Sequence, residues 1–296
     1  MSDQAYFRQL NQMLKNHSRA LPSLLLDLDR LDENIAVLNK DWNPHAQFRI
    51  VVKSLPCMGL LDYLMEKTKT KKLMVFHQPF LSELAGRLDA QADMLLGKPM
   101  PIKTAQYFYD HLPNLENDFD PFRQIQWLVD SPKRLEQYLA LAQRLGHPLR
   151  INLEIDVGLH RGGFATLAEL RASLEWLLAH QEDLIFSGLM GYDPHVVKLP
   201  KMIRSPQRAL QLANDFYQQC KTLIRAEFPA LWSENLTFNG AGSPTLKLHL
   251  SNSSPLNDIS AGSCLVKPTT FDLSTLTDYK AACFIATPIL KAFKNT

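Results

Sequence analysis

The stretch Phe48-Arg49-Ile50-Val51-Val52-Lys53-Ser54 decides the fold. Its run of apolar, β-branched residues is typical of a strand buried on both faces, as in a parallel sheet. The run ends in a lysine, and Pro56 follows as a strand stop. Two interpretations of Lys53 are open. Desolvation at the mouth of an apolar barrel would lower its pKa and leave a neutral amine for Schiff-base chemistry, whereas an ordinary strand-end lysine extends its charge into water.

Seven further strand-like runs follow, and helical patterns separate most of them. The predicted strands after the first cover residues 72–77, 93–97, 125–129, 149–157, 184–190, 236–239 and 259–266. The predicted helices cover residues 59–68, 80–90, 104–111, 132–146, 167–180 and 205–227. Eight strands alternating with helices predict an α/β protein with a parallel (β/α)8 TIM barrel. The competing doubly wound sheet usually carries GxGxxG after its first strand, and no such motif occurs in this sequence.

Both ends of the chain lie outside this repeat. Residues 5–16 predict an amphipathic helix, residues 23–28 a strand, and residues 29–40 a helix capped by Asp29. After Val266 the pattern changes, and residues 281–287 predict one strand outside the barrel. We therefore divide the chain into an N-terminal extension (1–20), a barrel (21–268) and a last segment (269–296).

Composition narrows the classes of function. The chain has 296 residues, 46% hydrophobic and 21% charged, with a net charge of +2. This charge is too small to indicate nucleic acid or an anionic membrane as a partner. The four cysteines form no CxxC pair and indicate reduced thiols. No stretch is long and apolar enough to span a bilayer, and the N-terminus has no signal-peptide pattern. We expect a cytoplasmic protein.

The candidate functional residues lie at the ends of the predicted strands, where the active site of such a barrel is found. The glycine loop Gly240-Ala241-Gly242-Ser243-Pro244-Thr245 follows the predicted strand 236–239, and the last predicted strand carries a second one, Gly262-Ser263. Glycines let backbone N–H groups approach an anion, and the hydroxyls of Ser243 and Thr245 add donors. Taken singly, each loop has an ordinary turn as its alternative. Together they stand where barrels bind phosphate.

Six motifs resemble the fold-type III pyridoxal-phosphate (PLP) family, which includes alanine racemases, D-threonine aldolases and eukaryotic-type D-serine dehydratases. In chain order they are PSLLLDLDRLDENI, VVKS, EIDVGLHRGGF, SGLMGYDPH, GAGSPT and DISAGSCLVKP, and they extend from Pro22 to Pro268. EIDVGLHRGGF, from Glu154 to Phe164, is the most specific of them.

The resemblance implies a role for each candidate residue. Lys53 would hold PLP through a Schiff base, Arg161 would bond the phenolic oxygen of the ring, and Tyr192 would pack on the ring. The phosphate would lie among Gly242, Ser243, Thr245, Gly262 and Ser263. For the neighbouring residues, we expect His160 and Asp156 to support the loop that bears Arg161. Asp193 and His195 either contact substrate or are solvated.

Two departures from the family pattern affect the expected reaction. Racemases place an arginine opposite the pyridine nitrogen, just before the last glycine motif, whereas this sequence reads Asp258-Ile259-Ser260-Ala261. Without that cation the ring nitrogen can take a proton, which favours the aldolase and dehydratase branch. The family also carries a C-terminal β-domain, and by this resemblance we expect residues 269–296 to be only its beginning. That branch uses a divalent metal, and no metal ligands are visible because no histidine follows His249.

The leading hypothesis is therefore a PLP-dependent lyase acting on D-amino acids. The alternatives are a non-catalytic PLP-binding barrel and an amino-acid racemase. A sugar-phosphate barrel enzyme accounts for the phosphate loops but not for Lys53 or EIDVGLHRGGF. The family resemblance further implies a small amino-acid substrate and a homodimer.

Overall fold

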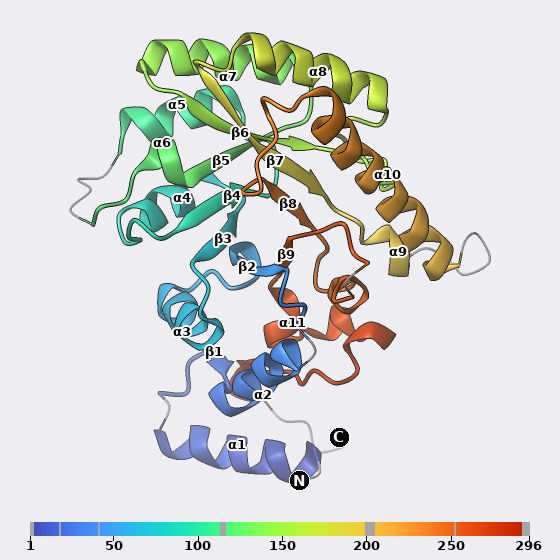
Figure 1. The fold of residues 1–296 in the computed structure, drawn as a ribbon. Coiled ribbons are helices and arrows are strands. Elements are labelled where there is room, and N and C mark those ends of the chain that lie inside the picture. The colour runs from blue at the N-terminus through green and yellow to red at the C-terminus, as the bar shows by residue number, and fades with distance from the viewer. Residues whose placement is uncertain are drawn as a thin grey trace.

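Eight parallel strands close into a barrel at the centre of the molecule (Figure 1). The computed structural model describes residues 3–17, 19–40, 42–112, 117–198, 205–251 and 253–291. The barrel strands are β2 (Gln47–Val51), β3 (Lys72–Val75), β4 (Asp93–Leu96), β5 (Ile125–Val129), β6 (Leu149–Glu154), β7 (Leu184–Gly191), β8 (Thr237–Gly240) and β9 (Asp258–Ala261). The ring closes where β2 pairs with β9, with Phe48 opposite Ile259. The predicted α/β fold with a parallel (β/α)8 barrel is confirmed.

Helices cover the outside of the barrel and follow most of its strands (Figure 1). Those that match predicted helices are α3 (Met58–Thr68), α4 (Gln78–Ala85), α5 (Ile102–Asp110), α7 (Pro132–Leu145), α8 (Leu167–Ala179) and α10 (Pro206–Glu227). Proline occupies the first turn of α7 and α10, where its fixed φ suits the helix and its missing N–H costs nothing. Short helices that the sequence pattern did not predict are α6 (Pro121–Gln124) and α9 (His195–Lys198). β8 and β9 are joined by the 3-10 turn η2 (Leu246–His249).

Several predicted boundaries are wrong by a few residues. β2 ends at Val51, and Lys53 lies in the 3-10 turn η1 (Val52–Ser54). β9 ends at Ala261, and the rest of that predicted strand is helix α11 (Ser263–Val266). A Cβ at Gly262 would lie 2.5 Å from the carbonyl oxygen of Val51, so only glycine lets the two chain segments come this close.

Two further boundaries differ near predicted caps and loops. The predicted strand 149–157 ends at Glu154 as β6, before the loop that bears Arg161. Helix α2 (Leu28–Asn39) is capped by Asp27 instead of Asp29, because the Asp27 carboxylate accepts the N–H of Arg30 at 3.0 Å.

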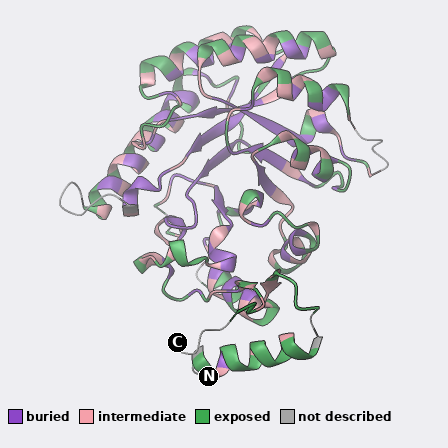
Figure 2. Cartoon of the chain, turned by 180° about the vertical axis from the view of Figure 1, so that it is seen from behind, coloured by how far each residue is buried: buried purple, intermediate pink, exposed green. Residues whose placement is uncertain are grey.

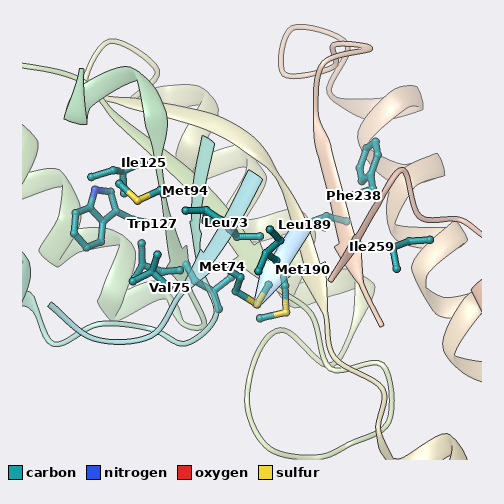
Figure 3. Packing of buried hydrophobic residues seen from close by; sticks show 14 of the residues in the cluster. Leu73, Met74, Val75, Met94, Ile125, Trp127, Leu189, Met190, Phe238 and Ile259 are labelled. Atoms are coloured by element: carbon teal, nitrogen blue, oxygen red, sulfur yellow. The ribbon is translucent and has the colours of Figure 1, made fainter. Parts of the chain in front are cut away.

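The barrel strands form the hydrophobic core. Figure 2 shows that the strands are buried along almost their whole length, while the helices are exposed on their outer faces. Neighbouring strands contribute side chains to one cluster, in which Leu73, Met94, Ile125 and Trp127 are fully buried (Figure 3). The Trp127 indole N–H donates to the hydroxyl of Tyr109 at 2.9 Å, which satisfies its one buried donor.

A buried ionic cluster occupies the amino-terminal end of the barrel, opposite to Lys53. Arg49 is fully buried and donates to both carboxylate oxygens of Asp258, at 2.8 and 2.9 Å, and to Asp93 at 2.7 Å. Lys72 approaches Asp258 at 3.2 Å, and Arg150 approaches Asp93 at 2.9 Å. Burial alone would raise the pKa of Asp258, but Arg49 and Lys72 hold it below its ordinary value. Both carboxylates are therefore paired and ionised.

A two-stranded antiparallel sheet lies outside the barrel, and it contains the strand predicted over residues 281–287. It pairs β1 (Ser23–Leu26) with β10 (Cys283–Ala286). Helix α1 (Asp3–His17) packs on it through Tyr6 and Phe7, whose rings lie 5.8 and 5.7 Å from that of Phe284. α1 and this sheet lie together at one end of the molecule (Figure 1). The sheet pairs a strand that precedes the barrel in sequence with one that follows it. The domain boundary that we placed at residue 268 stays a prediction.

The segment between the barrel and β10 contains the 3-10 turns η3 (Thr269–Phe271) and η4 (Ser274–Leu276). The Asn34 amide of α2 donates hydrogen bonds to the carbonyls of Leu265 and Lys280, both at 2.8 Å, and so connects this segment to α2. None of the helices within the described ranges is long and apolar enough to cross a membrane.

Candidate active site

A cavity at the carboxyl end of the barrel gathers almost all the candidate residues. The predicted residues that line it are Lys53, Arg161, Tyr192, Gly242, Ser243, Gly262 and Ser263. They come from the loops after β2, β6, β7, β8 and β9, so residues far apart in sequence meet at one site. Met74 of β3 and Met190 of β7 approach the cavity from opposite sides of the barrel and supply apolar surface (Figure 3).

Lys53 reaches the cavity from the turn after β2. Its Nζ lies 4.1 Å from the centroid of the Phe76 ring, a cation–π contact. Gly97 makes room for that ring, because a Cβ there would lie 2.3 Å from Phe76 Cζ. Solvent still reaches the side chain. Partial burial nevertheless lowers the pKa of Lys53, and the positive charges of Lys98 and Arg161 lower it further.

We expect the pH dependence of covalent labelling at Lys53 to report these neighbouring charges. Lys98→Met removes a cation, so the pKa of Lys53 rises and the neutral amine forms only at higher pH. The rate at which PLP and borohydride label Lys53, measured against pH, should then shift toward higher pH. Lys15→Met on α1 is the matched control. An unchanged profile for Lys98→Met, or a shift toward lower pH, would contradict the electrostatic explanation.

Arg161 is held over the cavity by two contacts. Its Nη2 donates to Glu154 Oε1 at 3.3 Å, and its guanidinium carbon lies 5.1 Å from the centroid of the Tyr192 ring. Glu154 is buried at the end of β6, and burial raises its pKa although Arg161 opposes the shift. A buried carboxylate beside a half-exposed arginine fixes the direction in which the guanidinium points.

The loop between Glu154 and Arg161 takes its shape from Asp156. The carboxylate of Asp156 accepts the backbone N–H groups of Gly158 and His160, both at 2.9 Å, and lies 3.0 Å from His160 Nδ1. His160 has a positive φ of 57° and an exposed ring. Asp156 and His160 therefore support the loop, as the sequence predicted.

The two glycine loops and Ser54 line one part of the cavity, which we call the phosphate cradle. Ser243 Oγ accepts the N–H groups of Cys264, at 2.9 Å, and Gly262, at 3.3 Å. On the other side, the hydroxyls of Ser54 and Ser263 lie 2.8 Å apart. A Cβ at Gly242 would lie 2.7 Å from the Tyr192 ring, so only glycine brings the backbone this close. Backbone N–H groups and hydroxyls at the ends of β8 and β9 suit a phosphate.

Thr245 and Asp193 lie outside the cavity. Thr245 was predicted to contribute to the phosphate site. It is fully buried, and its hydroxyl donates to Asp193 Oδ1 at 2.7 Å instead of lining the cavity. Asp193 is buried too and lies 2.6 Å from His249 Nε2. His195 is also buried, beneath Gly158. Asp193 and His195 are thus buried instead of solvated, and neither lines the cavity.

The sequence analysis missed several residues that line the cavity. The polar ones are Ser54, Asn239 and Ser260, and the aromatic ones are Phe76 and Phe271. Asn239 and Ser260 end β8 and β9 just before the two glycine loops, and this position was the signal that would have found them. Among the described residues, no group of three or more His, Cys, Asp or Glu side chains is arranged to hold a metal.

Comparisons with solved structures identify the same barrel. D-threo-3-hydroxyaspartate dehydratase from Delftia sp. HT23 has a TM-score of 0.71 at 17% identity, over 89% of this chain and 66% of that one. D-threonine aldolase from Filomicrobium marinum has a TM-score of 0.69 at 18% identity, over 89% and 68%. Alanine racemase from E. faecalis has a TM-score of 0.66 at 17% identity, over 91% and 66%. At these identities the likeness shows the fold alone.

The chain spans about two thirds of the length of these proteins. A search of curated protein sequences gives no match. The family model for the alanine racemase N-terminal domain matches residues 26–267, which include every barrel strand and every residue of the cavity except Phe271. The chain therefore belongs to the alanine racemase N-terminal domain family of fold-type III PLP barrels.

Proposed function

We propose that this protein binds PLP covalently through Lys53 and acts as a lyase on D-amino acids, in the manner of a D-threonine aldolase or D-serine dehydratase. One observation carries the proposal. Lys53, Arg161, Tyr192 and both glycine loops line the same cavity, although they come from five different strand ends. Family membership supports the cofactor, and the contents of the cavity support the reaction class.

The residues present fit PLP. Lys53 supplies an amine with a lowered pKa for the aldehyde, and Ser243, whose oxygen accepts the N–H of Gly262, keeps its own hydroxyl hydrogen for the phosphate. Arg161 supplies a cation for the phenolic oxygen, held in place by Glu154. When bound, PLP withdraws electrons from the amino acid attached to it and stabilises negative charge on its α-carbon. The chain's own residues hold the cofactor, and Lys53 is placed to move a proton.

The choice of a lyase rests on the bases that line the cavity. Retro-aldol cleavage and β-elimination need one proton acceptor or donor, and Lys53 can supply it. Racemisation needs acid–base groups on both faces of the α-carbon. Among the described residues that line the cavity, Tyr192 is the one further candidate for that task, and burial raises its pKa. Similar structures named as a dehydratase and an aldolase agree with the lyase proposal.

A non-catalytic PLP-binding barrel is the second candidate. It keeps the roles of Lys53, Arg161 and the glycine loops in holding PLP and assigns no reaction to the cavity. Relatives also complete their sites across a homodimer, which stays a prediction for this chain.

The test is an assay of the purified protein with PLP, with and without a divalent metal. D-threonine is followed by aldehyde release, D-serine by ammonia and pyruvate release, and D-alanine by loss of chirality. The L-enantiomers and Lys53→Ala are the controls. Release of aldehyde or ammonia from D-substrates alone supports the lyase. Loss of chirality without these products supports a racemase, bound PLP without turnover supports the carrier, and failure to bind PLP overturns the whole proposal.

A further inference from the structure

The deepest polar side chains of the cavity are Asn239 and Ser260. They are 1% and 2% exposed, whereas solvent reaches Lys53 and Arg161 at the mouth. We call this pair the cavity floor. The other polar groups are already assigned by the proposed function, since Lys53 takes the aldehyde, Arg161 the phenolic oxygen and the glycine loops the phosphate. The floor has no assignment, and it contains no charged group of its own.

The hydrogen bonds of the floor have a fixed direction. Asp258 is an ionised carboxylate held by Arg49, so it only accepts hydrogen bonds. It lies 2.5 Å from Asn239 Nδ2, which fixes the amide so that its NH2 group faces Asp258. The same nitrogen lies 2.7 Å from Ser260 Oγ. Both hydrogens of the amide are then in use, and Ser260 is an acceptor toward Asn239.

This arrangement leaves the hydroxyl hydrogen of Ser260 to the cavity. Among the described residues, the hydrogen bond found for the Ser260 hydroxyl is the one it accepts from Asn239, and Ser260 lines the cavity. In pyridoxal phosphate the aldehyde-bearing carbon and the ring nitrogen stand opposite each other across the ring. With the aldehyde end at Lys53 and the phosphate in the glycine loops, the ring nitrogen would lie on the side away from the lysine. The floor is the polar surface available there.

We infer that Ser260, oriented by Asn239 and Asp258, donates its hydroxyl hydrogen to the ring nitrogen of PLP and thereby keeps that nitrogen unprotonated. The inference rests on the proposed function. It differs from the expectation that loss of the arginine frees the nitrogen to take a proton, because a neutral donor now occupies the position. An unprotonated ring withdraws fewer electrons from the substrate than a pyridinium does.

Cofactor binding tests this inference without using activity. The probes are PLP and its 1-deaza analogue, in which a C–H group replaces the ring nitrogen, titrated by fluorescence quenching. Losing one hydrogen bond costs about 1 kcal/mol, so Ser260→Ala should weaken PLP binding about fivefold. Binding of the deaza analogue should stay within about twofold of wild type, because it makes no bond to Ser260. Ser54→Ala, in the phosphate cradle, is the matched control and should weaken both ligands equally.

A second measurement reads the protonation state directly. The ¹⁵N chemical shift of ring-labelled PLP bound to the wild-type protein should be that of a neutral pyridine, and Ser260→Asp should move it to that of a pyridinium. A pyridinium shift in the wild type overturns the inference, as does an equal loss of both ligands in Ser260→Ala. In these cases PLP still binds and the proposed function stands. If the wild type binds neither ligand, the proposed function fails first.

Discussion

Replacing Arg49 with methionine is expected to destabilise the protein by about 3–5 kcal/mol, measured by urea unfolding at about pH 7. Arg49 is fully buried and pairs with Asp258 and Asp93. Without Arg49, these two carboxylates keep only the more exposed cations Lys72 and Arg150 as charged partners. Removing one member of a buried ionic cluster exposes the desolvation cost of the others. Arg49 also donates to the carbonyls of Leu73 and Asp93, which would lose a donor.

The matched control is Arg171→Met. Arg171 also makes two hydrogen bonds to one carboxylate, that of Glu227, each at 2.7 Å, but both side chains are more than 40% exposed. Solvent screens such a pair, and we expect a loss of about 0–1 kcal/mol. Equal losses in the two variants would contradict the assigned role of the buried cluster.

The effect of Arg49→Met should depend on pH. In the wild type, Arg49 helps to lower the pKa of Asp258 and Asp93, so their stabilisation is present above the unfolded pKa and is lost as pH falls through the folded pKa. In the variant, burial is opposed only by the rim cations and the pKa of both carboxylates rises. Protonation then relieves the penalty, and the difference between variant and wild type should shrink at about pH 4. A constant difference would show that lost packing dominates.

Lys53→Ala is expected to abolish covalent attachment of PLP. It should also lower the turnover of a D-amino acid by at least about 100- to 10,000-fold, which is the usual contribution of one acid–base group. The phosphate cradle and Arg161 are untouched, so PLP should still bind reversibly. Absorbance of the bound cofactor, before and after borohydride, measures both effects. Lys98→Ala is the matched control, because Lys98 is the neighbouring lysine that acts on the pKa of Lys53. Undiminished covalent attachment in Lys53→Ala would assign the amine to another lysine.

The barrel could be predicted because its signals are local. Each βα unit carries its own apolar run and its own helix start, as at Pro132 and Pro206, so eight units are visible one at a time. Lys53 and Arg161 could be predicted for a related reason. They lie in short motifs at strand ends, and parallel strands bring those ends together. The structure confirms the barrel and brings both residues into one cavity.

What the sequence missed depends on partners far along the chain. Arg49 reads as one polar residue in an apolar strand, and its partner Asp258 is 209 positions away. Thr245 has the right chemistry for a phosphate loop, yet Asp193 of another loop takes its hydroxyl. Ser263–Val266 is apolar enough to predict a strand, but it forms helix α11 directly after Gly262, where the backbone lies close to Val51. At Arg49 and Thr245, tertiary contacts override the local pattern.

The most direct test of the central claim is borohydride trapping of PLP on the wild-type protein, followed by peptide mapping. The account predicts a yellow complex whose absorbance is lost on reduction, and one phosphopyridoxyl group on the peptide that contains Lys53. A label spread over several lysines, or placed on a different one, would contradict the assignment of Lys53 as the cofactor lysine. Absence of any label would contradict the claim that the cavity binds PLP covalently.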